Sequence, residues 1–276
     1  MLFDLLQDFV GQKKLAGWPD FVIKNSLKEY LQFPVLAFFY SRPNYREGIF
    51  MGGSALRIVY GLPRLSEDLD FDWPVGAAKP DLVRLGEEII KYFQKEWRLA
   101  ATYRAQGEER LYLKFPILKD LDLAAGTEES NFLYVKLEFS AADFIAPEYE
   151  VASVSGFGFN FIVKTYSLKF LMTGKISAIF SRAWYKGKTN DIDIKGRDYY
   201  DLYWYFNKGV EPDWATLTAK FGIKNMAELK VRLQDKIKTA VTARKLRYDL
   251  INFFPEQEFI TGFCDNYREI MKKYLF

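Results

Sequence analysis

The feature that most constrains the fold is the stretch LSEDLDFDW (residues 65–73), in which acidic and apolar residues alternate. Alternation with a period of two is typical of a β-strand, whose successive side chains point to opposite faces of a sheet. Asp68, Asp70 and Asp72 would therefore share one face of this strand, and the apolar residues between them would share the other. The stretch predicts a sheet with one buried face and one acidic face.

Three carboxylates on one strand face repel one another unless a cation lies among them. A solvated strand face without a function is the alternative, but the upstream sequence favours a site. GIFM (48–51) leads into Gly52 and Gly53, and SALRIVYG follows as a short predicted helix capped by Ser54. Glycine permits close approach to the backbone, and amides at a helix N-terminus can hold a phosphate. For the two glycines, a tight turn and nothing more is the competing interpretation.

Further polar residues extend the candidate site. Arg64 and Ser66 provide a cation and a hydroxyl suited to phosphate oxygens. Glu138 and Lys136 share one face of a second predicted strand, NFLYVKLEFS (131–140). Two aspartates and an acid from a neighbouring strand would make an all-oxygen site for Mg²⁺, which orients a triphosphate and offsets developing charge. An ordinary ion pair between Glu138 and Lys136 is the alternative.

Missing residue types exclude many mechanisms. The chain has 276 residues, no histidine and one cysteine, Cys264. This composition excludes Ser–His–Asp and Cys–His catalysis, HExxH zinc sites and an internal disulfide framework. The formal charge of +3, from 39 basic and 36 acidic residues, does not by itself indicate a nucleic-acid binder. Any chemistry must therefore use carboxylates, lysine, arginine, tyrosine, serine or a hard metal ion.

The N-terminus and the apolar runs bear on localisation. MLFDLLQDFVGQKK carries acids at positions 4 and 8 and lacks the basic region of a signal peptide. No apolar run approaches the roughly 20 residues of a membrane span. We expect a cytoplasmic protein that has no membrane partner.

Periodicity predicts an α+β fold. Strands and helices mix before about residue 150, helices dominate after about 165, and the Gly- and aromatic-rich segment 154–166 is interpreted as a crossover. We predict an N-terminal α/β lobe with a mixed sheet at 1–150 and a mainly helical lobe at 151–276 that completes a cleft. Other predicted elements are a helix at 20–34 that ends at its proline, an amphipathic helix at 79–97, strands at 98–105 and 109–117, and helices at 167–182 and 196–209.

The pattern GG-[ST]-A-L followed by R-x-S-x-D-L-D-F resembles the AbiEii/AbiGii toxin family of nucleotidyltransferase-like proteins, within the DNA polymerase beta-type nucleotidyltransferase superfamily. The chain supplies GGSAL at 52–56 and RLSEDLDF at 64–71. Later family motifs appear in order as GKISAIFSR (174–182) and KGRDYYDLYW (195–204). The resemblance runs from about residue 48 to 206, and the last 70 residues offer no motif.

The resemblance implies a metal-dependent nucleotidyltransferase that moves a nucleoside monophosphate from an NTP to an acceptor, such as a tRNA 3′ end. It also implies a toxin of a toxin–antitoxin or phage-defence system, with a separately encoded antitoxin as partner. The implied catalytic residues are Asp68, Asp70, Lys175 and Asp201. The implied nucleotide-binding residues are Gly52, Gly53, Ser54, Arg64, Ser66, Lys136, Arg182, Arg197 and Asp198. The implied ligands of Mg²⁺ or Mn²⁺ are Asp68, Asp70 and Glu138.

Spacing alone leaves the second set of residues open. Asp198 and Asp201 share a helix face at i and i+3, and Arg197 can reach Asp201 at i+4. A charged pair beside a buried aromatic stripe would have the same pattern, and Lys175 in its apolar helix could be a snorkelling lysine. The functional interpretation has Lys175 bind the triphosphate while Asp201 positions the acceptor or acts as base.

Two other functions fit the same residues. The metal site could serve nucleotidylation of a protein or another phosphotransfer, or the protein could bind nucleotide or RNA without catalysis. Intact acids in both motifs argue against the last function, because a pure binder has no need of a carboxylate trio.

Overall fold

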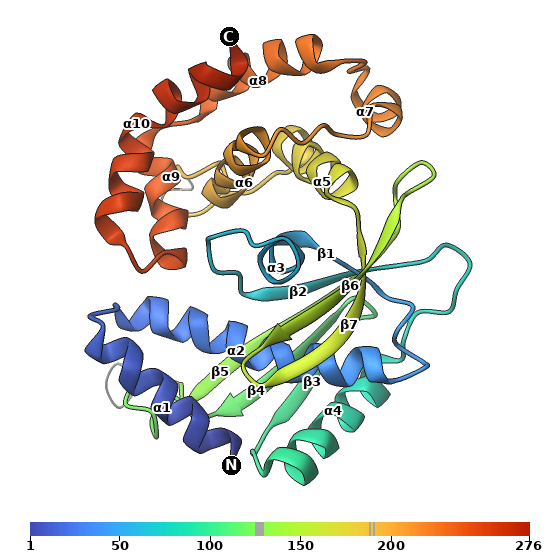
Figure 1. The fold of residues 1–276 in the computed structure, drawn as a ribbon, viewed down its shortest axis with the longest axis vertical. Coiled ribbons are helices and arrows are strands. Elements are labelled where there is room, and N and C mark those ends of the chain that lie inside the picture. The colour runs from blue at the N-terminus through green and yellow to red at the C-terminus, as the bar shows by residue number, and fades with distance from the viewer. Residues whose placement is uncertain (125–129, 188, 190) are drawn as a thin grey trace. The chain divides into compact units, whose positions relative to one another are not determined.

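The computed structural model describes residues 1–124, 130–187, 189 and 191–276, and the chain divides into two compact units. The first unit comprises residues 1–143 and 149–165, and the second comprises residues 144–148 and 166–276. Strands and helices build the first unit and helices build the second (Figure 1). The predicted α+β class is confirmed.

The elements of the first unit are α1 (Leu2–Leu15), α2 (Asp20–Ser41), β1 (Ile49–Met51), α3 (Gly52–Ile58), β2 (Asp68–Trp73), α4 (Leu82–Trp97), β3 (Thr102–Gln106), β4 (Arg110–Pro116), β5 (Phe132–Ala141), β6 (Tyr149–Gly156) and β7 (Phe159–Tyr166). Those of the second unit are α5 (Leu168–Ser181), α6 (Gly196–Asn207), α7 (Trp214–Phe221), α8 (Met226–Ala240), α9 (Ala243–Leu250), a 3₁₀ turn (Ile251–Phe253) and α10 (Gln257–Leu275).

The strands of the described chain form one sheet in the order β3-β4-β5-β2-β1-β7-β6. β2 pairs with β1 in antiparallel and with β5 in parallel, and β1 pairs with β7 in parallel, so the sheet is mixed as predicted. The acidic strand β2 therefore lies inside the sheet, between the strand that precedes the glycine turn and the strand that carries Glu138.

The apolar face of β2 forms the core of the first unit. Leu69 and Phe71 are completely buried. The ring of Phe71 stacks on Phe39 of α2, with centroids 4.4 Å apart, and on Phe139 of β5 at 5.4 Å. Burial of one face in this way fixes the register, because a slip by one residue would turn the aspartates into the core. The alternation seen in the sequence is thus the alternation between core and polar face.

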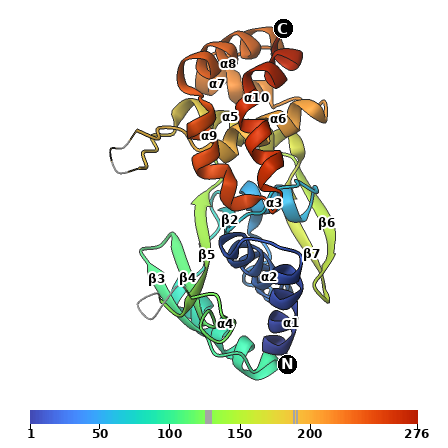
Figure 2. The same cartoon turned by 90° about the vertical axis from the view of Figure 1, so that its left-hand side faces the viewer.

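Helix α4 covers the edge of the sheet formed by β3 and β4 (Figure 2). It begins at Leu82 because Asp81 caps it, accepting a hydrogen bond from the Val83 backbone amide at 2.9 Å. Its apolar stripe includes Phe93, whose ring lies 4.9 Å from that of Phe115 on β4. Side chains along β3 and β4 alternate between more buried and more exposed positions. The more exposed ones form the polar face of these strands, on the side opposite this core.

Two local predictions were wrong. α2 does not end at Pro34 but continues to Ser41, and Pro34 and the apolar residues that follow it are buried. The free energy gained by their burial offsets the loss of the backbone hydrogen bond that proline cannot donate within a helix. Residues 154–166 are not a crossover but belong to the β6–β7 hairpin, which turns through Phe157 and Gly158, both with positive φ. Positive φ at both central residues is the geometry of a type I′ turn.

In the second unit, α6 lies between α5 and α9 (Figure 1). Its aromatic stripe is buried, with Tyr199 and Tyr205 nearly or completely inaccessible. The Tyr267 hydroxyl of α10 donates a hydrogen bond of 3.0 Å to the Tyr199 carbonyl. The aromatic residues of this helix therefore form core, in agreement with the buried aromatic stripe that the sequence pattern allowed.

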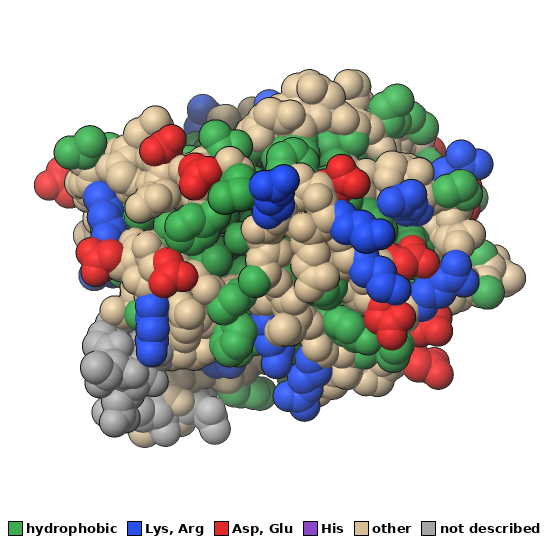
Figure 3. Space-filling model, turned by 90° about the horizontal axis from the view of Figure 1, so that it is seen from below, with side chains coloured by type: hydrophobic (Ala, Val, Ile, Leu, Met, Phe, Trp, Pro, Cys, Tyr) green, Lys and Arg blue, Asp and Glu red, His purple; other side chains and the backbone are tan. Residues whose placement is uncertain are grey.

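The surface mixes charges of both signs. In the face shown in Figure 3, basic and acidic side chains lie interspersed among apolar ones and do not gather into a patch of one sign. This pattern agrees with the near balance of 39 basic and 36 acidic residues. None of the helices in the described part of the chain has the length and hydrophobicity that crossing a bilayer requires.

Candidate functional site

The glycine turn packs directly against the acidic strand. Gly52 begins α3 with φ of +75°, a conformation that favours glycine. A Cβ at this position would lie 2.1 Å from Oδ2 of Asp70. A Cβ at Gly53 would lie 2.7 Å from Nη2 of Arg64 and 2.8 Å from Oγ of Ser66. Because they lack a Cβ, the two glycines allow the turn to pack against Arg64, Ser66 and Asp70 of the second motif.

Ser54 connects the turn to the acidic strand and does not cap the helix, so that prediction was wrong. α3 starts two residues earlier than predicted, with Met51 at its N-cap, because Gly52 adopts the turn conformation. The Ser54 hydroxyl donates a hydrogen bond to the Asp68 carbonyl. Through this bond the start of β2 is held against α3.

Arg64 and Ser66 lie behind the turn and are almost inaccessible. The Arg64 side chain is 2 % exposed and donates from Nη1 to the Leu65 carbonyl at 2.9 Å. The Ser66 carbonyl accepts a hydrogen bond of 3.3 Å from Nε2 of Gln32 on α2. Arg64 thus supports the backbone that carries the aspartates. Its predicted contact with phosphate stays a prediction.

Strand register places the acids side by side. Asp70 is the direct partner of Met51 on β1 and of Glu138 on β5, and Asp68 is the partner of Lys136. Neighbouring strands lie about 4.8 Å apart, so the polar side chains of β2 and β5 share one continuous surface. The sequence predicted that Glu138 would lie on a strand beside the aspartates, and the register places it there.

Lys136 connects two of the carboxylates. Its Nζ lies 2.9 Å from Oδ2 of Asp68 and 3.3 Å from Oε1 of Glu138. Arg110, which the motifs did not point to, donates from Nε to Oε1 of Glu138 at 2.8 Å. Burial, followed by the Glu67 charge, raises the pKa of Asp68, although Lys136 opposes this effect. Burial would lower the pKa of Lys136, but Asp68 and Glu138 outweigh it and the pKa is raised.

The donor set suits a hard divalent cation in kind. Asp68, Asp70 and Glu138 offer carboxylate oxygens, the ligands that Mg²⁺ and Mn²⁺ prefer. Among the described residues, however, no three acidic or cysteine side chains already converge on a common metal position. The ammonium of Lys136 supplies positive charge between two of the acids instead. The oxygen ligands of these residues are therefore of the kind that binds Mg²⁺ or Mn²⁺. Lys136 is paired with two of the three carboxylates, Asp68 and Glu138.

Asp72 belongs to the interior. It is 4 % exposed, and its Oδ1 accepts a hydrogen bond of 2.6 Å from the Ser140 hydroxyl on β5. The third acid of the alternating strand therefore stabilises the pairing of β2 with β5 and lies apart from the Asp70–Gly52 contact.

A second cluster lies inside the helical unit. Nζ of Lys175 on α5 lies 2.8 Å from Oδ1 of Asp198 and 2.8 Å from Oδ2 of Asp201, both on α6. Nη1 of Arg182 lies 2.6 Å from Oδ2 of Asp198. Asp201 is completely buried. The structure therefore brings together four residues that the resemblance implied, and it joins them as ion pairs; their roles toward a substrate stay predictions.

Two other polar residues of the helical unit were missed by sequence reasoning. Asp249 on α9 accepts from the backbone amide of Arg197 at 2.8 Å and from its Nε at 3.2 Å. Lys195 precedes Gly196 at the start of α6, and burial together with Arg197, Lys175 and Arg182 lowers its pKa to about 8. Its position next to the R-D-x-x-D motif could have identified Lys195, whereas nothing in the local sequence points to Asp249.

The ion pairs of Asp198 predict that the free energy of unfolding falls at acidic pH. Burial would raise its pKa, but Lys175, Arg182 and Lys195 outweigh burial and hold the pKa below its ordinary value. The stabilisation that the charged Asp198 side chain contributes is therefore complete above the unfolded-state pKa of about 3.9, and it is lost as pH falls through the folded-state pKa. We expect the free energy of unfolding to fall more steeply in the wild type than in Asp198→Asn as the pH is lowered through the unfolded-state value of about 3.9 and below it. Urea titrations followed by tryptophan fluorescence measure this, and parallel pH profiles would contradict it.

The comparison with protein families agrees with the motifs. The family model described as nucleotidyl transferase AbiEii toxin, type IV toxin–antitoxin system, matches residues 38–276. Two solved structures from Helicobacter pylori, JHP933 and a candidate nucleotidyltransferase, each align with a TM-score of 0.45 and 19% identity. Each alignment covers 89% of this chain and 93% of the other. No curated protein matches the chain.

Proposed function

The chain belongs to the family of AbiEii nucleotidyl transferase toxins of type IV toxin–antitoxin systems, and from this membership we propose that it transfers a nucleoside monophosphate from an NTP to an acceptor. The single observation that carries the proposal is the contact of the Gly52 backbone with the Asp70 carboxylate, beside Asp68 and Glu138. A side chain at Gly52 would collide with this carboxylate, so glycine at this position is what allows the turn and Asp70 to lie against each other.

The proposed reaction is an in-line displacement at the α-phosphorus. The acceptor hydroxyl oxygen forms a bond to phosphorus, the bond to the bridging oxygen of the β-phosphate breaks, pyrophosphate leaves, and the hydroxyl proton passes to a carboxylate. A divalent ion, when bound, neutralises charge on the phosphates and orients them. The protein mainly positions the reactants, which suits a chain without histidine.

In this proposal Asp68, Asp70 and Glu138 would hold Mg²⁺ or Mn²⁺, and the amides of the glycine turn would face phosphate oxygens. Lys136 would move its ammonium from the carboxylates to the phosphates as the metal binds, since both cations compete for the same oxygens. The proposed acceptor is an RNA 3′ end, as in a tRNA, and the proposed protein partner is a cognate antitoxin.

The reaction class is tested with labelled nucleotide. Purified protein is incubated with Mg²⁺, total tRNA and ATP, GTP, CTP or UTP carrying label on either the α- or the γ-phosphate. Nucleotidyl transfer predicts that α-label alone enters RNA, and the NTP that works names the donor. Transfer of γ-label would identify phosphoryl transfer and refute the proposal, and α-label on protein would replace the RNA acceptor by a protein hydroxyl.

A further inference from the structure

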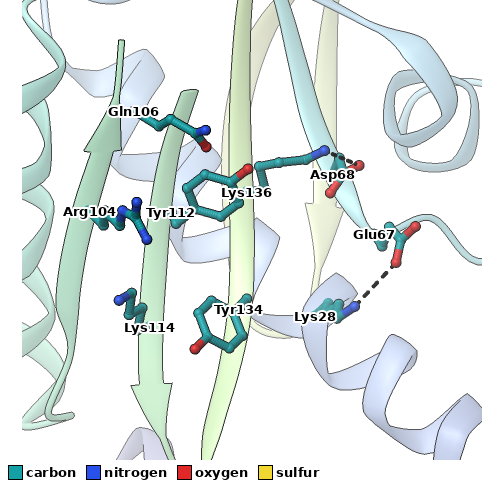
Figure 4. Close-up of a pocket in the computed structure, with 9 residues that line it drawn as sticks. All are labelled: Lys28, Glu67, Asp68, Arg104, Gln106, Tyr112, Lys114, Tyr134 and Lys136. Atoms are coloured by element: carbon teal, nitrogen blue, oxygen red, sulfur yellow. Dashed lines mark hydrogen bonds and ion pairs between the residues drawn. The ribbon is translucent and has the colours of Figure 1, made fainter. Parts of the chain in front are cut away.

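A pocket of about 520 Å³ lies on the polar face of the sheet in the first unit (Figure 4). Asp68 forms part of one wall, and the pocket extends from there over β5 and β4 to β3. Four basic side chains line it against two acidic ones, and the basic ones are Lys28, Arg104, Lys114 and Lys136. The pocket is therefore positive overall, although the charge of the whole chain is nearly balanced.

Strand register arranges these residues in rows. Arg104, Tyr112, Lys136 and Asp68 are successive partners on β3, β4, β5 and β2. At about 4.8 Å per strand, this row spans roughly 14 Å. It leads without interruption from the edge of the sheet to the acidic strand. A ligand that follows the row would arrive at the proposed catalytic aspartates.

The basic residues near the edge of the sheet are available to a ligand. Lys28 pairs with Glu67 at 3.2 Å, and Lys136 pairs with Asp68. By contrast, within the described part of the chain no carboxylate forms an ion pair with Arg104 or Lys114. Their charges can therefore be neutralised by an anion that binds from solution.

Two tyrosine rings lie among these cations. Figure 4 shows Tyr112 and Tyr134 rising from β4 and β5 on the same side of the sheet as Arg104 and Lys114. Tyr134 is 40% exposed, and Nζ of Lys114 lies 5.9 Å from its ring centroid. Exposed rings next to cations bind unpaired bases by stacking while the cations contact the phosphates. A free phosphate or an acidic peptide would use the cations but would leave the rings without a role.

We propose that Arg104, Tyr112, Lys114 and Tyr134 form an acceptor face that binds single-stranded RNA and directs its 3′ end toward Asp68. That the 3′ end of the RNA points toward Asp68 rests on the proposed function, whereas the binding of RNA to this face does not. The acceptor face gives the RNA contacts outside the nucleotide site, so it sets affinity for the acceptor and leaves affinity for the NTP unchanged.

The test measures RNA binding without NTP, by fluorescence anisotropy of a labelled single-stranded oligoribonucleotide at several salt concentrations. We expect Arg104→Gln/Lys114→Gln to weaken binding on the order of tenfold and to reduce the log–log salt slope by about 1.4, since each phosphate that is no longer neutralised lowers the slope by roughly 0.7. Lys91→Gln/Lys95→Gln is the matched control, because it removes the same charge from exposed positions on α4, which packs on the other face. Tyr134→Ala should weaken binding at least about fivefold, and Tyr134→Phe, which keeps the ring, should not.

Other outcomes would overturn the inference. If the Arg104→Gln/Lys114→Gln variant binds RNA as tightly as the wild type does, these residues do not form an acceptor face. Loss of ATP affinity with unchanged RNA affinity would make the pocket part of the nucleotide site, and failure of the wild type to bind RNA would exclude an RNA acceptor there. If RNA binds as expected but no label is transferred from any NTP, the acceptor face stands and the proposed reaction fails.

Discussion

The variant Asp68→Asn/Asp70→Asn is expected to lose nucleotidyl transfer by a factor on the order of 10³ or more, because it removes two of the three carboxylates proposed to hold the metal that would orient the phosphates. The substitutions keep the shape of the side chains, which matters where Asp70 contacts the Gly52 backbone. The fold should persist, since burial already disfavours the charged form of Asp68 and raises its pKa. Single-turnover transfer of α-labelled NTP to RNA, with melting temperature recorded in parallel, measures both effects.

Asp72→Asn is the matched control for this variant. Asp72 lies on the same strand, two residues from Asp70, but it is buried against Ser140. We expect its transfer rate to stay within a few-fold of wild type, while its melting temperature reports on the β2–β5 pairing. A double variant that retains more than about a tenth of the wild-type rate would contradict the assignment of the aspartates, since the loss expected is on the order of 10³.

Lys175→Met is expected to lower the free energy of unfolding by about 3–5 kcal/mol, because it takes the ammonium from two buried carboxylates. Nζ of Lys175 lies 2.8 Å from oxygens of both Asp198 and Asp201, and Asp201 is completely buried. For a chain of this size, the destabilisation corresponds to a fall in melting temperature of roughly 6–20 °C. Thermal and urea unfolding measure it directly.

Lys169→Met provides the comparison on the same helix. The Lys169 side chain is 40% exposed and pairs with Glu148 at 3.3 Å and with Asp213 at 3.4 Å. Asp213 keeps its hydrogen bond from the Thr216 amide without Lys169, so the removal of Lys169 should cost about 1 kcal/mol or less. Adding Asp201→Asn to Lys175→Met should recover part of the stability, because it removes one uncompensated buried charge. Equal stability of the Lys175 and Lys169 variants would show that Lys175 does not hold the cluster together, and would favour a role limited to substrate.

The parts of the fold that could be predicted from the sequence are those set by local periodicity. The alternation around Asp70 predicted both the strand and its polar face, because one face had to be buried against Phe39 and Phe139. Glycine at position 52 was readable as a turn, since only a residue without Cβ fits against the aspartate. The mainly helical second half followed from its 3.6-residue pattern.

Other features depend on partners far along the chain. Nothing near Pro34 shows that burial of the following residues carries the helix through the proline. The partnership of Arg197 with Asp249 joins α6 to α9 across 52 residues, and no local pattern encodes it. Likewise, the acceptor face exists only because the register of β3, β4 and β5 aligns residues that are scattered in the sequence. Tertiary pairing decides these contacts.

The most direct test of the central claim is the position of the metal in a crystal of the protein with Mn²⁺ and a non-hydrolysable NTP analogue, located by its anomalous scattering. The proposed site predicts a peak about 2.1 Å from carboxylate oxygens of Asp68 and Asp70, with the triphosphate over the turn at Gly52 and Gly53. A peak bound by other residues, or nucleotide bound away from the turn with Lys136 still paired to Asp68, would contradict it.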